Sequence, residues 1–350
     1  MAVTIYDVAR YAGVGIGTVS RAMNNSPRIK PETKARIQKA IRELKYRPHA
    51  LARGLALQKT GLVAILLPVF TGYFYIELLK AIQQEISQHD YDLVLYSITR
   101  SDRTGPCLRR ILEDRRVDGV LVLSLQIPDA VVQLFRRSGL PVVLADGMHE
   151  KLDSFFVENE QGAFEAASYL IAMGHSRIGM IDARLSSPPA HSRLIGFRRA
   201  LAAHHIQWDP GRLVISDTVS EKDGFNREAG YEAMKHLLAL KNNRPTGVFI
   251  SSDIQAAGAV QAVREAGLGI PDDMAIVGFD DIELAEYLGL TTMHQPLSEM
   301  GGMAVRRLIE RIENPDLPVL RRGFDTRLVV RQSCGGNRTG ASQSLNGARS

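Results

Sequence analysis

The sequence predicts two kinds of fold in one chain: an all-α helix-turn-helix head, then an α/β core of two parallel-sheet lobes. The first 46 residues are short segments in which apolar residues recur at helical spacing. From about Gly61 onward, apolar strand-like runs alternate with amphipathic helices. The length of 350 residues also exceeds that of one ordinary domain.

The segment 4–24 predicts two short helices joined by a tight turn. Gly13 lies at the turn, where a residue must tolerate a positive φ. Apolar residues form one stripe before the turn and another after it: Ile5, Val8, Ala9 and Ala12, then Val14, Val19, Ala22 and Met23. Two short helices that cross in this way form a helix-turn-helix, whose second helix lies in the DNA major groove.

The same glycines offer an alternative. Gly13, Gly15 and Gly17 resemble the glycine pattern of a phosphate-binding loop. That interpretation needs a buried strand before the glycines, but residues 6–12 have helical spacing and no Gly-Lys-Ser/Thr follows. The helix-turn-helix is therefore the preferred interpretation.

The head continues with a third helix over residues 31–45. Pro31 and Glu32 suit a first helical turn, and Ile37, Ala40, Ile41 and Leu44 form its apolar stripe. Residues 50–56 predict a short helical piece with Gly54 in its middle, which costs about 1 kcal/mol relative to Ala. We expect this piece to be disordered in the free protein and to fold on DNA. Residues 1–46 thus form the DNA-binding domain, and 47–60 the hinge helix or linker.

Charge is distributed unevenly along the chain. Residues 1–60 hold twelve Lys and Arg against three acids, a net charge of +9, whereas the remainder carries −4. A basic head on a mildly acidic body favours a polyanionic partner for the head alone. The alternative, an ordinary solvated surface, does not explain why the charge coincides with a helix-turn-helix.

The two cysteines, Cys107 and Cys334, lie far apart and fit no metal-ligand spacing, so we expect neither a metal nor another cofactor. A reduced, cytoplasmic compartment is the simple interpretation. The N-terminus lacks the pattern of a signal peptide, and the longest apolar stretch is too short to span a bilayer. We therefore expect no membrane partner.

The core, residues 61–334, predicts two lobes, each a parallel sheet with helices on both faces. The predicted strands are nearly continuously apolar, as strands buried on both faces are: 62–67, 93–96, 119–123, 142–145, 178–181, 247–250 and 275–279. Ligands of such folds bind at the carboxyl ends of strands and between lobes. Asp146, Asp253 and the pair Asp280-Asp281 follow strand ends, although each acid there could instead cap a helix.

The tail, residues 335–350, is rich in Gly, Ser, Asn and Arg and is predicted to be disordered. It contains no apolar heptads that could form a coiled coil. We therefore expect a dimer rather than a tetramer.

Several short motifs occur in an order that resembles one family of bacterial transcription regulators, the LacI/GalR family, over residues 2–334. These motifs are Tyr6-Asp-Val-Ala9, Thr18-Val-Ser-Arg21, Tyr46-Arg-Pro48 with Leu51-Ala52 and Leu55, Tyr169-Leu170 with Gly174-His175 and Ile178, Arg193 with Gly196-Phe197 and Ala200-Leu201, Ala256 with Gly258-Ala259, and Val277-Gly-Phe-Asp-Asp281.

The resemblance implies a homodimer that binds a pseudo-palindromic operator in double-stranded DNA. Ile16, Gly17 and Arg21 match positions that read bases. Further positions match DNA contacts: Thr4, Thr18, Ser20 and Asn24 at phosphates, and Ala52 and Leu55 in the hinge. Leu55 would be a wedge in the minor groove, although it could instead be an ordinary packing residue. Gly15 departs from the common serine and loses an N-cap hydroxyl and a phosphate contact.

For the core, the resemblance implies a periplasmic-binding-protein-like fold with an effector between its lobes, which the chain crosses near residues 158, 290 and 322. The implied effector contacts are Phe74, Tyr75, Arg193, Ser252, Asp253, Asp280 and Gln295. Aromatic faces together with Arg and Asp suit a sugar. The loop at 71–74 departs from the usual Asn-Pro-aromatic pattern, Arg193 could instead form a surface ion pair, and Trp208 is expected to pack rather than bind.

The sequence therefore predicts a sequence-specific DNA-binding regulator, most simply a repressor, controlled by a small carbohydrate effector. One alternative is an exported sugar-binding protein, which the basic head does not favour. Another is a sugar- or nucleotide-processing enzyme, but no nucleophile–base pair stands out, and His175 and His204-His205 fit surface or turn positions. A regulator controlled by a phosphoprotein co-repressor also remains open.

Overall fold

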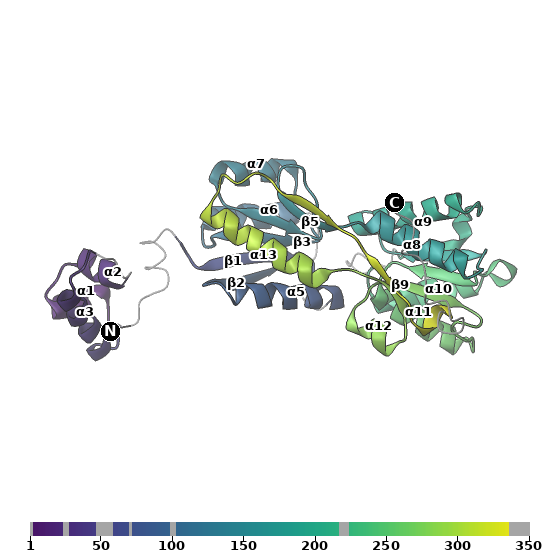
Figure 1. Ribbon diagram of the computed structural model, residues 1–350, viewed down its shortest axis with the longest axis horizontal. Coiled ribbons are helices and arrows are strands. Elements are labelled where there is room, and N and C mark those ends of the chain that lie inside the picture. The colour runs from purple at the N-terminus through teal and green to yellow at the C-terminus, as the bar shows by residue number, and fades with distance from the viewer. Residues whose placement is uncertain are drawn as a thin grey trace, which may run out of the picture.

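The computed structural model describes residues 3–23, 28–46, 59–69, 72–98, 103–216 and 224–335. A head, an N-terminal lobe and a C-terminal lobe follow one another along the long axis of the molecule (Figure 1). The head is all-α, and each lobe is built on one six-stranded sheet, so the predicted fold class is confirmed. Asn24, the hinge residues Ala52 and Leu55, the short helical piece predicted at 50–56 and the tail beyond Gly335 lie outside the described residues.

The head contains α1 (Ile5–Ala12), α2 (Ile16–Met23) and α3 (Pro31–Glu43). The apolar stripes of all three helices meet in one core, in which Val8, Val19 and Ala40 are fully buried. Gly13 ends α1 with a φ of 62°, the left-handed conformation that the turn was predicted to need. Since a helix and not a strand precedes the glycines, the phosphate-loop interpretation is wrong.

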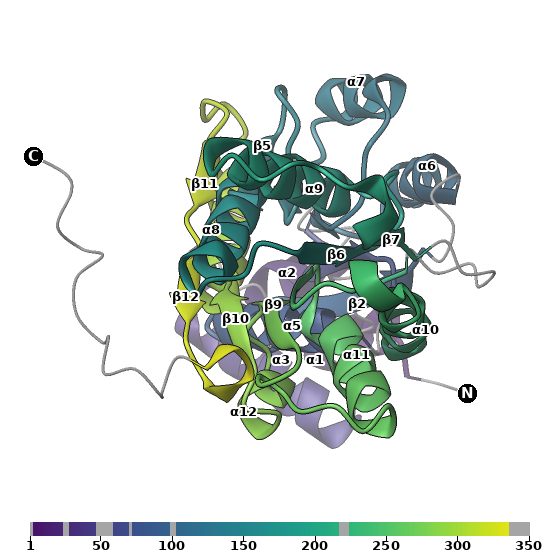
Figure 2. The ribbon, with the colours of Figure 1, turned by 90° about the vertical axis from the view of Figure 1, so that its right-hand side faces the viewer.

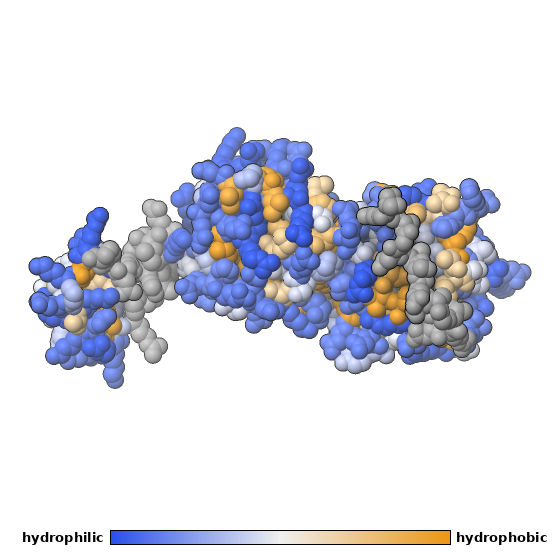
Figure 3. Space-filling view, viewed as in Figure 1, coloured by the Kyte–Doolittle hydropathy of each residue, from blue (hydrophilic) through white to orange (hydrophobic). Residues whose placement is uncertain are grey.

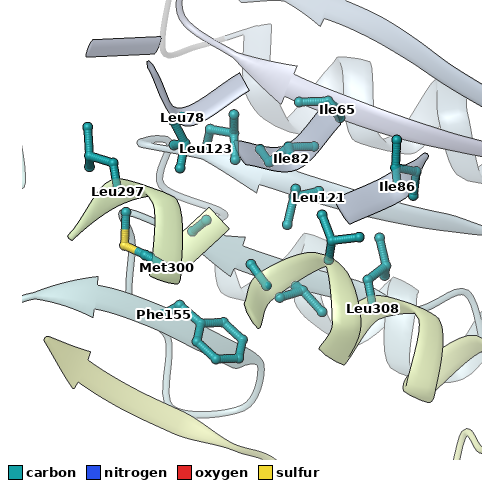
Figure 4. Close-up of a cluster of buried hydrophobic side chains, with 14 of the residues drawn as sticks. Ile65, Leu78, Ile82, Ile86, Leu121, Leu123, Phe155, Leu297, Met300 and Leu308 are labelled. Carbon is teal, nitrogen blue, oxygen red and sulfur yellow. The ribbon is translucent and has the colours of Figure 1, made fainter. Parts of the chain in front are cut away.

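The N-terminal lobe, or N-lobe, has the parallel strand order β11-β5-β4-β3-β1-β2. Its strands are β1 (Leu62–Leu67), β2 (Asp92–Ser97), β3 (Gly119–Leu123), β4 (Val142–Ala145), β5 (Asp153–Val157) and β11 (Arg321–Phe324). Its helices are α5 (Tyr73–Ile86), α6 (Thr104–Asp114), α7 (Asp129–Ser138) and α13 (Leu297–Glu313). Helices α5 and α13 cover one face of the sheet, as Figure 4 shows from the packing of Leu78, Leu121 and Met300, and α6 and α7 cover the other.

The C-terminal lobe, or C-lobe, has the order β12-β10-β9-β8-β6-β7, parallel except where β12 pairs with β10. Its strands are β6 (Ile178–Asp182), β7 (Leu213–Ile215), β8 (Gly247–Ile250), β9 (Ala275–Asp280), β10 (Thr291–His294) and β12 (Arg327–Val329). Its α-helices are α8 (Asn159–Ala172), α9 (Pro188–Ala203), α10 (Arg227–Leu238), α11 (Asp253–Glu265) and α12 (Glu283–Tyr287), and three 3₁₀ turns are η2 (Pro210–Arg212), η3 (Lys241–Asn243) and η4 (Gln332–Cys334). Helices α8 and α9 lie on one side of the sheet, and α10 and α11 on the other (Figure 2).

All seven predicted strands are present, to within one residue at each end. The sequence missed β5, β7, β10, β11 and β12. Strand β5 begins with a buried carboxylate, Asp153, which accepts hydrogen bonds from Arg307 Nε at 3.1 Å and Arg311 Nη2 at 2.7 Å. Strand β11 lies at a sheet edge and is mostly exposed. Neither strand has the continuous apolar run that predicts a central strand.

The chain crosses between the lobes three times. The first crossing is at Glu158, between β5 and α8, as predicted. The second runs through Gln295 and Pro296, between β10 and α13, and the third through residues 325–326, between β11 and β12, a few residues later than predicted. The Glu158 N–H donates to the Phe324 carbonyl at 2.9 Å, which ties the first crossing to the third. Among the described residues, no helix is long and apolar enough to cross a membrane.

Close helix pairs in the C-lobe depend on glycine. A Cβ at Gly196 of α9 would lie 1.9 Å from the Glu160 carbonyl oxygen of α8. Gly230 of α10 and Gly258 of α11 are equally close to the backbone of the facing helix. These backbones touch, so any side chain at the three positions must push the helices apart.

Replacing Gly196 should therefore disrupt the α8–α9 contact. We expect Gly196→Ala to lower the free energy of unfolding by more than about 2 kcal/mol, because the added methyl group meets backbone rather than a movable side chain. The matched control is Gly105→Ala in α6, where the nearest atom, Val131 Cγ2, lies at an ordinary 3.5 Å. Equal melting temperatures for the two variants would contradict this description.

Candidate functional site

A cleft that holds about 690 Å³ of empty space, open solvent included, forms the interlobe cavity, where the carboxyl ends of the strands of both sheets face each other. Residues of both lobes line it: Val69, Gly72, Tyr73, Phe74, Tyr75, Ser124 and Asp146 from the N-lobe, and Ser187, Pro189, Arg193, Phe225, Ser252, Ile254, Asp280 and Ile282 from the C-lobe. Its wall combines aromatic rings, carboxylates and one guanidinium, as a site for a polar organic molecule does.

The N-lobe contributes a hydroxyl and a carboxylate at adjacent strand ends. Ser124 follows β3 and Asp146 follows β4, with φ values of 52° and 54°. The Ser124 hydroxyl donates to Asp146 Oδ2 at 2.5 Å. Among the described residues, the other oxygen of this carboxylate has no hydrogen-bond partner. Two non-glycine residues side by side in the left-handed region are uncommon, and such backbone concentrates at binding sites.

The C-lobe contributes the buried Arg193 of α9, which is 3% exposed. Its Nε donates to Asn159 Oδ1 at 2.8 Å, and its Nη1 donates to the Ser251 carbonyl. The guanidinium also lies over the Phe279 ring, 3.8 Å from the centroid. These contacts hold the cationic head rigidly at the cavity wall.

Asp280, at the end of β9, faces this guanidinium. Its Oδ1 lies 3.8 Å from Arg193 Nη2 and accepts a hydrogen bond from Gln295 Nε2 at 2.6 Å. Its φ is 120°, again in the region that favours glycine. Gln295 lies at the second crossing, so the cavity wall is bonded directly to the connection between the lobes.

Burial raises the pKa of the carboxyls around Arg193. The pKa of Asp146 rises to about 6 and that of Asp280 to about 7, because desolvation outweighs the hydrogen bonds and the nearby guanidinium that favour the charged forms. Burial also raises the pKa of Asp182 to about 7 and that of Asp253 well above its ordinary value. Four buried acids thus share one buried cation.

Five of the seven predicted effector residues line the cavity: Phe74, Tyr75, Arg193, Ser252 and Asp280. Asp253 and Gln295 do not line it and lie one layer behind the wall. Asp253 accepts from the Thr292 hydroxyl at 2.6 Å and the Ile282 N–H at 3.1 Å, while Gln295 donates to Asp280. Asp253 and Gln295 thus hold the residues of the cavity wall in place.

The structure also bears on the other roles considered for Arg193, for the residues at the strand ends and for Trp208. Arg193 is buried, so the surface ion-pair alternative is wrong. Ser252 is the N-cap of α11 and also lines the cavity, and Asp253 begins that helix. Trp208 packs edge-on against Phe197 with the centroids 6.0 Å apart, as expected for a packing residue.

The sequence missed several lining residues, including Ser124, Ser187 and Phe225. Asp146 is predicted in the same way as Asp280, because both follow apolar strands and parallel strands end at one edge, and it does line the cavity. Ser187 precedes α9 in the C-lobe. Phe225 lies in a loop, and nothing in its local sequence predicts that it faces the other lobe.

A second candidate site lies on the head. Ile16, Gly17 and Arg21 of α2 are exposed, while Thr18 and Ser20 are half-buried. Thr4 precedes α1, and its hydroxyl donates to Asp7 Oδ2 at 2.7 Å. Mostly hydrophilic residues cover the visible face of the head in Figure 3. The residues expected to read bases therefore share an accessible helix.

The head and the core of the chain each match a known domain family. The family described as "Bacterial regulatory proteins, lacI family" matches residues 4–49, and a "Periplasmic binding protein-like domain" matches residues 167–334. The chain is 35% identical to the ribose operon repressor of Escherichia coli (strain K12) over 335 residues, 94% of this chain and 99% of that protein. The chain belongs to the LacI family.

Two solved structures extend the comparison of this LacI-family protein. The Lac repressor dimer bound to operator and the anti-inducer ONPF superposes with a TM-score of 0.81 at 25% identity, covering 95% of this chain and 99% of that one. The transcriptional regulator CelR–cellobiose complex superposes with a TM-score of 0.68 at 30% identity and the same coverage. Known regulators therefore share the whole arrangement of head and two lobes.

The raised pKa of Asp146 predicts how the stability of the folded core changes with pH. Its folded pKa of about 6 exceeds the ordinary 3.8, so the native state holds a proton that the unfolded state releases between these values. The contribution of the Asp146 carboxyl to the free energy of unfolding is therefore fully present at low pH, and it is lost as the pH rises toward 6. We expect Asp146→Asn to stabilise the core relative to the wild type at pH 7.5, with the gain shrinking toward pH 4.5. A gain that does not change with pH, measured by thermal unfolding, would contradict the assignment.

Proposed function

We propose that this LacI-family protein is a transcriptional repressor whose operator affinity is controlled by a small molecule in the interlobe cavity. The observation that carries the proposal is the cavity itself, whose two walls come from different lobes and converge on Arg193, Asp146 and Asp280. A molecule that touches both walls must favour one relative position of the lobes. A protein with this function works in the cytoplasm, where operator DNA lies.

The effector is a neutral polyhydroxylated molecule, most simply an unphosphorylated sugar. Asp146 and Asp280 accept hydrogen bonds that hydroxyl groups can donate, and Phe74, Tyr75 and Phe225 offer ring faces to an apolar side of the ligand. A phosphate group on the ligand would lie beside these two carboxylates, and the like charges would repel each other. The similarity to a ribose operon repressor and to a cellobiose-bound regulator supports this ligand class.

Control of DNA binding follows from how the wall is attached. Asp280 is bonded to Gln295 at the second crossing, and Glu158 to Phe324 at the first and third. Ligand contacts that pull the walls together thus act on the second connection through Gln295, and the bond between Glu158 and Phe324 joins the first connection to the third. The N-lobe also joins the linker to the head, so its rotation changes how two heads are presented to an operator, with a coupling of about 1–3 kcal/mol.

Two copies of the chain are needed for a pseudo-palindromic operator. The N-lobe offers a surface for that contact at its free sheet edge, strand β2, where Leu95 is 43% exposed. Tyr73 and Ile76 of the adjacent helix α5 are also exposed. Tyr73 also lines the cavity, so we place the dimer interface on the other two exposed apolar residues, Ile76 and Leu95.

The other functions fit the molecule less well. An exported sugar-binding protein has no use for a basic helix-turn-helix, and the relatives compared above are regulators. Within the described ranges, no group of three or more His, Cys, Asp and Glu residues is arranged to hold a metal ion. Control by a co-repressor protein alone would not explain the lined cavity, so we favour a small-molecule effector. We also favour a regulator over an enzyme.

The effector assignment is tested by ligand screening followed by operator binding. We expect neutral sugars, and not their phosphates, to raise the melting temperature and to change operator affinity. Asp146→Ala should weaken the effective sugar by about tenfold or more, since it loses a charged acceptor, while operator binding without sugar is unchanged. Asp129→Ala, a surface acid of the same lobe, is the control. Binding of sugar phosphates alone would contradict the assignment.

The dimer surface is tested by sedimentation. Leu95→Asp places a charge in the proposed interface and should give a monomer at micromolar concentration, with operator affinity falling steeply. Ile195→Asp, an exposed apolar residue of α9 in the C-lobe, should leave the dimer intact. A dimer in both variants would show that the interface lies elsewhere.

A further inference from the structure

Residues 103–140 of the N-lobe form a basic segment on an otherwise acidic core. The segment holds seven arginines, no lysine and four acids, a net charge of +3, whereas the chain beyond residue 60 carries −4 overall. All seven arginines are exposed. Four of them, Arg115, Arg116, Arg136 and Arg137, lie at the ends of α6 and α7. None of these four forms an ion pair with another residue that the structure describes.

The ends of α6 and α7 lie at the edge of the N-lobe from which the linker leads to the head. Helices of a parallel α/β lobe run against the strands, so each helix ends at the edge where the next strand begins. Strand β1 begins at the same edge, at Leu62, on the side of the lobe nearest the head (Figure 1). The carboxylate of Asp118, two residues after Arg116, accepts hydrogen bonds from the N–H groups of Thr60 at 2.7 Å and Gly61 at 2.8 Å. The end of α6 is thus bonded directly to the end of the linker.

Helix α6 places an arginine where the backbone favours glycine. Helices commonly end on a residue in the left-handed conformation, which glycine adopts most easily. Helix α7 follows this rule with Gly139, whose φ is 73°. Helix α6 instead ends on Arg115, with a φ of 48°. The fold therefore gains nothing from an arginine at this place that a glycine would not supply, and the exposed side chain is available to a partner.

The acids of this edge lie mostly on the other face of the sheet. Asp90 follows α5 and Glu313 ends α13, and these two helices cover the face opposite α6 and α7. At the ends of α6 and α7 the Asp118 carboxylate is already bound to the linker, so Glu113 and Asp114 are the acids that stand against the four arginines. The charge on the α6–α7 side of the edge is therefore positive.

We propose that this basic edge, formed by Arg115, Arg116, Arg136 and Arg137, binds backbone phosphates of the DNA to which the head is bound. Guanidinium groups form paired hydrogen bonds with phosphate oxygens, and a segment that uses arginine without lysine suits this partner. Phosphate contacts carry no sequence information, so the N-lobe adds affinity while the head selects the site. The inference rests on the proposed operator binding and extends the DNA contact from the head to the N-lobe.

The experiment measures DNA affinity against salt concentration for the full-length dimer. The two ligands are an operator that the wild type selects from a randomised library and an unrelated duplex of the same length. Each phosphate contact contributes about 0.9 to the slope of log affinity against log salt concentration. We expect Arg136→Ala/Arg137→Ala to make this slope shallower by about 1–2, and to weaken both duplexes by a similar factor, about tenfold near 0.1 M salt.

A matched control removes two exposed arginines from the C-lobe, the lobe away from the head. In this variant, Arg177→Ala/Arg264→Ala, one residue precedes β6 and the other lies in the last turn of α11. The control has the same change in net charge as the α7 variant. It should leave the slope unchanged and alter affinity less than about twofold, because the two residues lie far from the DNA.

Arg115→Gly separates a DNA contact from a structural role. Glycine relieves the left-handed backbone at the end of α6, so this variant should melt no lower than the wild type. The substitution also removes one charge from the basic edge, so the affinity for both duplexes should fall and the slope should become shallower by about 1. A residue needed for the fold alone would give the opposite result, a lower melting temperature with unchanged DNA affinity.

Two further outcomes would overturn the inference. Equal slopes for the wild type and for the variants of the basic edge would show that these arginines do not contact DNA. Loss of affinity for the operator alone, with the unrelated duplex unaffected, would show that they act through the sequence reading of the head and not through phosphates. A wild type that binds neither duplex would instead refute the proposed function, which is a separate result.

Discussion

The buried guanidinium of Arg193 is the charge on which the interlobe cavity depends. Asn159, the Ser251 carbonyl, Asp280 and the Phe279 ring surround it, so it is fixed in position before any ligand arrives. A buried cation is stable only when acids and hydrogen-bond acceptors compensate its lost hydration. Acids at the ends of β4, β6 and β9 supply this compensation, and these strand ends are also where the lobes meet.

The four acids near this guanidinium exceed what one cation can balance. Burial raises the pKa of Asp146, Asp182, Asp253 and Asp280. Four ionised carboxylates around one guanidinium are therefore unfavourable, and the cluster is stabilised when protons or hydroxyl groups donate to the carboxylates. A neutral ligand with several hydroxyls supplies such donors without adding negative charge. The same network is bonded to the second crossing through Gln295, which links ligand chemistry to the relative position of the lobes.

The sequence predicts most of the fold, because central parallel strands are continuously apolar and the head helices have clear stripes. It fails where long-range contacts replace local pattern: β5 depends on Asp153 with Arg307 and Arg311, which are distant in sequence. The cavity was predicted in part. Arg193 and Asp280 belong to recognisable motifs and Asp146 follows a predicted strand, whereas Phe225 lines the cavity only because two lobes fold toward each other. The residues behind the wall, Asp253 and Gln295, could not be told from those on it.

Control of operator affinity by one ligand-dependent movement of the lobes can be measured directly. Spin labels placed at Glu113 of the N-lobe and Glu265 of the C-lobe, both exposed, report the interlobe distance during titration with the effective sugar. We expect the interlobe distance distribution to shift with the same midpoint as the change in operator affinity. A change in operator affinity at a constant interlobe distance would contradict it.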